Sequence, residues 1–396
     1  MKKLVLLLLI AVLMVNCFAI SAAAEDDHTV PASEGDISQT VGGDLEIKAS
    51  SAVLMEAETG RILYEQNREE GLPPASVTKV MTLLLVAEAI DSGRIAAEDK
   101  VTISENAASM GGSQVFLEAG EQFSVEELIK CTVIASANDA AVALAEHVCG
   151  SESAFVEAMN ARAKELSLGS TVFENVTGLD DTTQHHVMSA GDIATISRHL
   201  IRHPIVMKYA STWMDSFRDG AFTLTNTNRL IRFYPGATGL KTGSTAKAKF
   251  CLTASARRDG MTLIAVVMGA ESRDVRNAET MRLLDYGFAN YALFSASCMA
   301  GESVKVACGR KDTVATEREG FSCVVKKGDV KRVQESVTMQ PSVKAPVHRG
   351  DEIGRAVYSL DGKEIGYSRI IASEDVGKMT FFELFEKIVC TFLHLA

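Results

Sequence analysis

The stretch that most constrains the fold runs from Pro73 to Lys79 and continues into the apolar segment 80–90. Two prolines at its start stop any preceding strand, because proline lacks the backbone N–H that a sheet requires. Apolar residues then recur at the spacing of an α-helix, namely Val77, Val80, Met81, Leu84 and Ala87. The pattern therefore predicts a turn that opens a helix buried in the core.

Ser76 and Lys79 are three residues apart, so one turn of that helix places both side chains on the same face. A hydroxyl is a poor nucleophile until a base takes its proton, and a neighbouring amine can be that base when burial lowers its pKa. The positive end of the helix dipole at Ser76 would also stabilise negative charge. Taken alone, the spacing is more typical of a capping serine beside a solvated lysine.

Two further motifs follow in order, Ser136-Ala137-Asn138 and Lys241-Thr242-Gly243. The first lies at the break between two predicted helices, 125–134 and 138–148, where a loop would direct its polar side chains into a cleft. An ordinary serine or asparagine cap is the alternative at that position. The second motif is predicted to lie at the start of the strand 248–257, where glycine lets the backbone of a ligand approach closely.

Three motifs in this order resemble those of the low-molecular-weight penicillin-binding proteins, the serine D-alanyl-D-alanine carboxypeptidases, although Ala137 stands where the general pattern has aspartate. The resemblance implies an α+β fold. In that fold a β-lactamase/transpeptidase-like catalytic domain, with a helical region and an antiparallel sheet, precedes a small all-β domain and a C-terminal amphipathic helix. It also implies a hydrolase that removes the terminal D-alanine from peptidoglycan pentapeptides through an acyl-enzyme and is inhibited by β-lactams.

Acyl transfer needs a nucleophile, a proton carrier, an oxyanion hole and a grip on the substrate. We expect Ser76 to be the nucleophile and Lys79 its base, with the ammonium destabilised by burial and by Lys241. Ser136 would relay the proton to the leaving amine, and Asn138 would hold the peptide amide. Lys241 would keep the electrostatic field positive for the substrate carboxylate.

The family's pattern implies the remaining substrate contacts. An oxyanion hole would be formed by the backbone N–H groups of Ser76 and Ser244, beside Gly243 on the substrate-binding strand. Thr242 would bind the terminal carboxylate. Arg276 stands where relatives place a carboxylate-binding arginine, with a solvated helix arginine as an equal alternative. Relatives often carry an aromatic residue or histidine at the position of Ser244, so we expect a changed pocket shape without loss of activity.

Composition divides the chain into successive segments. Lys2 and Lys3, an apolar run of about a dozen residues and a small-residue site at 22–24 predict a cleavable signal peptide. Polar, aperiodic residues then predict a linker. The expected boundaries are signal peptide 1–24, linker 25–47, penicillin-binding carboxypeptidase domain 48–293, β-rich domain 294–375 and amphipathic helix 378–396.

Pairs of apolar segments around turn residues predict three hairpins. They join 52–57 to 61–64, 248–257 to 261–269, and 357–360 to 365–371. The second pair would supply two central strands of the catalytic sheet, against which a helix over 275–291 would pack.

The last segment has a wide apolar face and a narrow polar stripe. It is too short to span a bilayer, and it suits a helix that lies in the membrane interface. A helix docked on its own domain is the alternative. With the leader, the segment predicts an exported protein held peripherally on the outer face of the cytoplasmic membrane.

The formal net charge of −11 and the absence of a basic stripe argue against a nucleic-acid partner. Partners would instead be peptides ending in D-Ala-D-Ala, β-lactams and the membrane surface. Among the cysteines, Cys308 and Cys323 are candidates for a bridge. We expect no metal and no cofactor, because the four histidines nearest to a ligand spacing lack a zinc-binding glutamate and suit the surface: His185, His186, His199 and His203.

Two other functions compete with the carboxypeptidase. A class A-like β-lactamase would deacylate through a glutamate acting on water, and Glu174-Asn175 is the only near match to such a loop. A non-catalytic penicillin sensor or wall-binding scaffold would have no need of Lys79 and Lys241. The segment 175–181, which contains Gly178-Leu179, lies where relatives of the carboxypeptidases have a similar loop.

Overall fold

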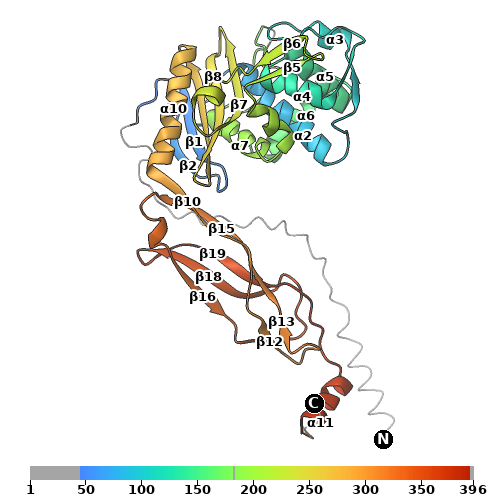
Figure 1. The fold of residues 1–396 in the computed structure, drawn as a ribbon, viewed down its shortest axis with the longest axis vertical. Coiled ribbons are helices and arrows are strands. Elements are labelled where there is room, and N and C mark those ends of the chain that lie inside the picture. The colour runs from blue at the N-terminus through green and yellow to red at the C-terminus, as the bar shows by residue number, and fades with distance from the viewer. Residues whose placement is uncertain (1–44, 182, 393–396) are drawn as a thin grey trace, which may run out of the picture. The chain divides into compact units, whose positions relative to one another are not determined.

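The structure is a computed structural model that describes residues 45–181 and 183–392 (Figure 1). The predicted signal peptide lies outside the described residues, as does the predicted linker up to residue 44. The described chain forms a helical region with a five-stranded sheet, then a part made of further β-sheets, then a last helix. The expected α+β class is therefore confirmed.

The five-stranded sheet is antiparallel throughout and has the strand order β2-β1-β9-β8-β7. Its strands are β1 (Ser51–Glu56), β2 (Ile62–Gln66), β7 (Ala237–Thr245), β8 (Lys249–Arg258) and β9 (Met261–Ala270). The predicted hairpins β1–β2 and β8–β9 are confirmed, and β8 and β9 are central strands as expected.

Both faces of this sheet are buried. Successive side chains of a strand point to opposite faces, so Val53 belongs to the core shared with the helical region, whereas Leu54 belongs to a second core. Helix α10 (Arg273–Asn290) covers the second face and α7 (Ala190–Leu200) the first, as Figure 1 shows. Burial of both faces explains why the central strands are almost continuously apolar in sequence.

Helix α2 (Lys79–Asp91) is the centre of the helical region, and ten of its 13 residues are buried. A helix surrounded by other helices needs an apolar surface all round, which is what the run after Lys79 provides. The elements around α2 and beyond are η1 (Ala75–Thr78), β3 (Lys100–Thr102), α3 (Glu105–Ala108), β4 (Gln122–Ser124), α4 (Val125–Ile134), α5 (Asn138–Cys149), α6 (Glu152–Glu165), α8 (Pro204–Ala210), β5 (Met214–Phe217), β6 (Phe222–Thr225) and α9 (Leu230–Phe233).

The prediction that Lys241-Thr242-Gly243 lies at the start of the strand 248–257 is wrong. The motif lies inside a strand of its own, the edge strand β7, which pairs with β8 in register Thr242 to Leu252. Two glycines and a buried lysine make β7 a weak strand by composition. Pairing with β8 and packing against the helical region override that weak propensity.

The residues after α10 form three further β-sheets of two, five and three strands, with strand orders β10-β15, β11-β14-β19-β18-β16 and β13-β12-β17. The third predicted hairpin, β18–β19, is confirmed; its turn residues Asp361 and Gly362 both have positive φ, as a tight hairpin turn requires. Bounds are β10 (Tyr291–Ala296), β11 (Met299–Ala300), β12 (Val304–Ala307), β13 (Thr313–Val314), β14 (Thr316–Arg318), β15 (Phe321–Lys326), η2 (Val330–Arg332), β16 (Gln334–Met339), β17 (Ser342–Lys344), β18 (Glu352–Leu360) and β19 (Lys363–Ala372).

The expected bridge between Cys308 and Cys323 is wrong, because every cysteine of the described residues is free. Cys323 lies on β15, paired with Phe294 of β10, whereas Cys308 follows β12 in another sheet. The two thiols therefore belong to different sheets of the β-rich part.

The last element is α11 (Phe381–Phe392). It confirms a helix within the predicted segment 378–396, of which residues 393–396 lie outside the described part. Among the described residues, every helix is too short or too polar to cross a bilayer.

Candidate active site

The first part of the site is the short 3-10 turn η1, which carries Ser76 and precedes α2. Ala75, just before the serine, has a left-handed backbone with φ 47°, and its carbonyl accepts a hydrogen bond of 2.8 Å from the Thr78 hydroxyl. Ser76 therefore lies in a tight turn before the α-helix, not in the helix itself. Residues three apart are eclipsed in a 3-10 turn, which keeps Ser76 and Lys79 on one side.

Lys79 is fully buried, and its Nζ lies 2.9 Å from Ser76 Oγ and 2.9 Å from the carbonyl oxygen of Thr177. Burial, and then repulsion by Lys241, lower the pKa of Lys79 well below its usual value; Asp139 opposes this shift. The lysine that touches the serine hydroxyl thus favours its neutral amine form.

Lys241 is the second buried lysine and lies on β7. Its Nζ donates hydrogen bonds to Ser136 Oγ at 2.7 Å and to the Thr242 carbonyl at 3.0 Å. Burial, and then repulsion by Arg276, lower the pKa of Lys241 to about 7. Each serine of the two motifs is therefore in contact with one buried lysine.

Ser136 lies in the break between α4 and α5, as predicted, whereas Asn138 is the first residue of α5; both are buried. Neither caps α5, whose N-cap is Ala137 without a side-chain hydrogen bond. Ser136 has a left-handed backbone with φ 63°, which turns its side chain toward Lys241. Asn138 Nδ2 donates to the Gly111 carbonyl at 2.7 Å, whereas Asn138 Oδ1 is buried without a hydrogen-bond partner.

Strand β7 meets the serine turn at Gly243. A Cβ atom at residue 243 would lie 2.7 Å from the Pro74 carbonyl oxygen and 2.9 Å from the backbone nitrogens of Ser76 and Val77. The sequence suggested that this glycine admits the backbone of a ligand. In the structure it admits the backbone of η1, and so brings the third motif against the first.

Arg276 lies in the first turn of α10 and is only 3% exposed. Its Nε and Nη2 donate to Asn277 Oδ1 at 3.1 and 3.0 Å, and it forms no ion pair with any residue of the described chain. The alternative of a solvated helix arginine is therefore wrong. Burial lowers the pKa of Arg276 to about 10, and its charge lies near enough to Lys241 to lower the pKa of that lysine.

The other predicted residues of β7 differ in exposure. Thr242 is buried, and its hydroxyl donates to Thr227 Oγ1 at 2.7 Å, whereas the Ser244 side chain is exposed. A hollow of about 430 Å³ lies beyond the motif, lined by Ser244, Thr245, Ala246, Lys249, Phe250 and Glu271. The altered residue after Lys-Thr-Gly thus forms part of the wall of a surface hollow.

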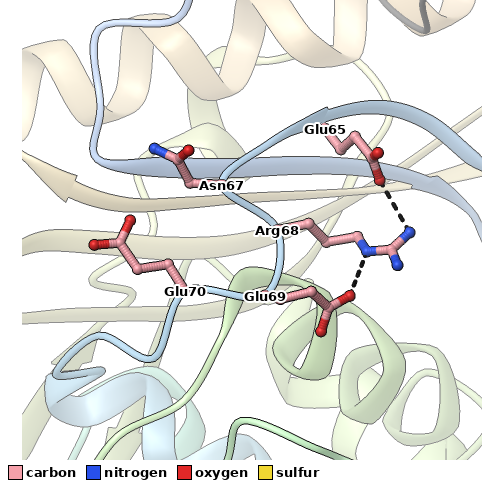
Figure 2. Close-up of a pocket in the computed structure, with 5 residues that line it drawn as sticks. All are labelled: Glu65, Asn67, Arg68, Glu69 and Glu70. Atoms are coloured by element: carbon pink, nitrogen blue, oxygen red, sulfur yellow. Dashed lines mark hydrogen bonds and ion pairs between the residues drawn. The ribbon is translucent and has the colours of Figure 1, made fainter.

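A larger hollow of about 580 Å³ lies after β2 and contains no residue of the three motifs (Figure 2). Arg68 forms ion pairs in it with Glu65 and Glu69. Because these groups are paired and largely exposed, this hollow does not offer the buried, reactive groups that distinguish the site around Ser76.

Two further residues of the site received no role from the sequence, although Thr177 lies in the segment 175–181 that resembles a loop of the relatives. Thr177 supplies the carbonyl that holds Lys79, and its loop is shaped by Asn175 Oδ1, which accepts from the Gly178 N–H at 2.7 Å. Asp139 is buried and accepts from the backbone N–H groups of Val115 and Leu117, both at 3.1 Å. An asparagine three residues before a glycine is a turn signal, but it does not show which side chain the turn will contact.

His186 is buried and hydrogen-bonded, so the expected surface placement is wrong for this histidine. His185 is exposed as expected, and His199 and His203 are half-buried, with His203 Nδ1 hydrogen-bonded to Asp91. Within residues 45–181 and 183–392, no group of three or more His, Cys, Asp or Glu side chains could hold a metal ion.

A helical region, an antiparallel sheet and a buried lysine beside each of two serines form the arrangement of the Ser-x-x-Lys acyl-transfer enzymes, the penicillin-binding proteins and β-lactamases. Within that class, residues 37–272 match the family model described as D-alanyl-D-alanine carboxypeptidase. Residues 288–378 match the C-terminal domain of penicillin-binding protein 5. The chain belongs to the D-alanyl-D-alanine carboxypeptidase family.

Individual relatives agree with this membership. The chain is 42% identical over 395 residues to the D-alanyl-D-alanine carboxypeptidase DacF of Bacillus subtilis, with 98% of each chain covered. Penicillin-binding protein 5 of Haemophilus influenzae has 34% identity and a TM-score of 0.73, over 84% of this chain and 99% of that one. Penicillin-binding protein D2 of Listeria monocytogenes, solved in the ampicillin-bound form, has 32% identity and a TM-score of 0.57, over 62% and 99%.

Proposed function

We propose that this protein is a serine carboxypeptidase that removes the terminal D-alanine from peptidoglycan pentapeptides through an acyl-enzyme on Ser76, and that β-lactams trap this acyl-enzyme. The observation that carries the proposal is the contact of 2.9 Å between Ser76 Oγ and the fully buried Lys79 Nζ. A buried amine that prefers its neutral form has a lone pair with which to accept the serine proton.

In the proposed acylation, neutral Lys79 takes the proton of Ser76, and Oγ attacks the carbonyl carbon of the penultimate D-alanine. The peptide C–N bond then breaks, and the leaving nitrogen takes a proton through Ser136, whose hydroxyl contacts Lys241. Water hydrolyses the resulting ester, which releases the shortened peptide and restores Ser76. The backbone N–H groups of Ser76 and Ser244 would stabilise the tetrahedral oxyanion, and loss of one such donor typically costs about a hundredfold or more in rate.

One unpartnered acceptor and one buried cation fit the ends of such a substrate. Asn138 Oδ1 is buried without a partner and can accept the N–H of the peptide. Arg276 is a buried cation without an ion pair in the described chain, and with Thr242 and Lys241 it can bind a terminal carboxylate. A carboxypeptidase has to recognise that carboxylate, so these groups favour removal of the last residue.

A class A-like β-lactamase is a weaker interpretation of the same site. Glu174, the candidate for its water-activating residue, is exposed, and its carboxylate accepts the backbone N–H groups of Gln184 and His185. A carboxylate engaged in this way stabilises its own loop. The described chain has no carboxylate hydrogen-bonded to Ser76 or Lys79.

A non-catalytic sensor or scaffold also fits less well. Burial of Lys79 and Lys241 opposes their protonation and destabilises the folded chain at neutral pH. A scaffold would lose stability by burying these lysines and gain no function from it. An acyl-transfer enzyme needs the neutral amine that burial provides.

Intact-mass analysis after incubation with penicillin tests the proposal. The wild type should gain one penicillin, whereas Ser76→Ala should gain none, and Lys79→Ala should stay unlabelled while folded because it lacks only the proton carrier. Release of D-alanine from a soluble pentapeptide should be lost in the same two variants. If the wild type and Ser76→Ala both carry the penicillin adduct, or if neither does, Ser76 is not the nucleophile. Rapid hydrolysis of penicillin by the wild type would instead favour the β-lactamase.

The same proposal places the protein outside the cytoplasm, with α11 lying in the surface of the cytoplasmic membrane. Four apolar side chains of α11 are between 59% and 81% exposed: Phe381, Phe382, Phe385 and Ile388. The polar side of the helix instead contacts the β-rich part, where Glu383 pairs with Arg310 and Lys387 with Asp312. An outward apolar face supports insertion into an interface over docking on the protein's own domain.

A further inference from the structure

A buried histidine lies behind the serine turn and takes no part in the proposed chemistry. His186 is 6% exposed; its Nδ1 accepts the Glu174 backbone N–H at 3.0 Å, and its Nε2 lies 2.8 Å from Thr78 Oγ1. A backbone N–H can only donate, so Nδ1 carries no proton. The single proton of the neutral ring is therefore on Nε2 and is donated to the Thr78 hydroxyl.

Thr78 links the hydrogen bond from His186 to Ala75, the residue next to the nucleophile. Its hydroxyl accepts from His186 and donates to the carbonyl of Ala75, at 2.8 Å. Ala75 has a left-handed backbone, which an alanine adopts only where the surroundings hold it there. The chain of hydrogen bonds from His186 thus ends on the peptide group that precedes Ser76.

The other side of the histidine holds the loop that positions Lys79. The Glu174 N–H begins this loop, and three residues later the Thr177 carbonyl contacts Lys79 Nζ. The next residue, Gly178, packs on the Ala75 carbonyl so closely that a Cβ atom would lie 1.8 Å from its oxygen. The loop and the serine turn therefore meet directly, and His186 joins them from behind.

We propose that His186 is a positioning residue, whose Nε2–H tautomer clamps the loop that holds Lys79 onto the turn that carries Ser76. This inference rests on the proposed roles of Ser76 and Lys79. The clamp acts through Thr78 and Glu174 and does not touch the substrate. It keeps the distance and direction between amine and hydroxyl fixed before substrate arrives, which is the part of acyl transfer most sensitive to small displacements.

The electrostatic surroundings keep this ring neutral. Burial lowers the pKa of His186 to about 4, against the opposing charges of Glu174 and Asp180. The Phe173 ring packs edge-on against the imidazole, and the Thr78 hydroxyl of η1 hydrogen-bonds to it. The donor and acceptor assigned to the two ring nitrogens therefore persist across the pH range in which Lys79 acts as a base.

Matched substitutions separate the two halves of the clamp. His186→Asn retains an acceptor near the position of Nδ1, and His186→Gln retains a donor near that of Nε2; each breaks one of the two bonds. Thr78→Val removes the hydroxyl and Thr78→Ser keeps it. His185→Ala is the control, because that neighbouring histidine is exposed.

Acylation by a fluorescent penicillin should slow by between about tenfold and a hundredfold in His186→Asn, His186→Gln and Thr78→Val. Thr78→Ser and His185→Ala should remain near the wild-type rate. Loosening the loop admits water to Lys79 and raises the pKa of its amine. In the plot of acylation rate against pH, the fall at low pH should therefore move to higher pH in the slow variants. A residue that only stabilises the fold would lower the melting temperature without moving that fall.

Backbone hydrogen exchange at Thr177 and Gly178 supplies a readout that is independent of activity. Exchange there should accelerate by about tenfold or more in Thr78→Val and not in Thr78→Ser. If Thr78→Val has the acylation rate, the pH profile and the hydrogen exchange of the wild type, the proposed clamp is overturned. This result would decide the matter even if the His186 variants fail to fold. A wild type that penicillin does not label would instead overturn the proposed function, and the exchange comparison would still decide the clamp.

Discussion

Two lysines with no ion pair in the described chain are as deeply buried as the core leucines around them, with exposures of 0% for Lys79 and 1% for Lys241. Each instead hydrogen-bonds to a serine hydroxyl and to one backbone carbonyl. Two neutral acceptors do not replace the water that would surround an ammonium ion with three N–H donors, so burial favours the neutral amine. At the scale of the residue, the site is therefore a place where the fold opposes protonation of its own side chains.

This opposition predicts an unusual pH dependence of stability. Between about pH 7, the pKa of folded Lys241, and 10.5, its ordinary value, the unfolded chain carries a proton that the folded chain lacks. The free energy of unfolding should therefore rise with pH by about 1.4 kcal/mol per unit from this group. Lys241→Met should remove that part of the slope, as measured by denaturant unfolding at pH 8 to 9.5.

The exposed Lys247→Met is the matched control for this measurement and should leave the wild-type slope unchanged. The sign follows from the lowered pKa: the destabilisation is fully present below the folded pKa and disappears as the pH rises toward that of the unfolded lysine. Parallel stability curves for wild type and Lys241→Met would show that Lys241 is not held in a neutral form.

At the scale of elements, the site depends on how closely β7 approaches η1. Gly243→Ala would place a Cβ atom within 3 Å of three backbone atoms of the turn, none of which can move aside as a side-chain end could. We expect a loss of stability of about 1–3 kcal/mol, as for overpacked cores. Penicillin labelling should fall more sharply than stability, because the substitution separates Ser244 from Ser76.

Gly169→Ala provides the comparison, since a Cβ atom there meets no heavy atom within 4 Å. It should retain both labelling and melting temperature. Labelling of Gly243→Ala at the wild-type rate would show that the contact between β7 and η1 is not needed to form the site.

At the scale of the whole molecule, the catalytic part and α11 should be separable in function. Deleting the residues after Gly377 removes the exposed aromatic face and should release the protein from membranes. Activity on a soluble pentapeptide should be kept, because no residue of the site lies beyond Arg276. Sedimentation with and without anionic vesicles, beside the peptide assay, measures both outcomes.

Phe382→Glu with Phe385→Glu tests the same face without truncation, and Val337→Glu on β16 is the control at another exposed apolar position. If the truncated protein stays with the membrane fraction to the same extent as the full chain, α11 is not its anchor.

Much of the fold could be predicted because local patterns and tertiary contacts agree. The run after Lys79 is apolar on all sides and became the central helix α2. The strand pairs β1–β2 and β8–β9 carry apolar segments around short turns, and both hairpins formed as expected. Strand β7 was missed because its glycines and buried lysine serve contacts with η1 and Ser136, which local propensity does not record.

The sequence by itself determined the order of the three motifs and the types of residue in them, and these alone led to the family and its chemistry. Tertiary structure decided what each group contacts: Lys79 with Thr177, Arg276 buried instead of solvated, and His186 behind the serine turn. The physical reason is distance along the chain. Spacing within a helix or strand follows from backbone geometry, whereas burial and the pKa shifts it causes depend on segments about a hundred residues apart that only folding brings together.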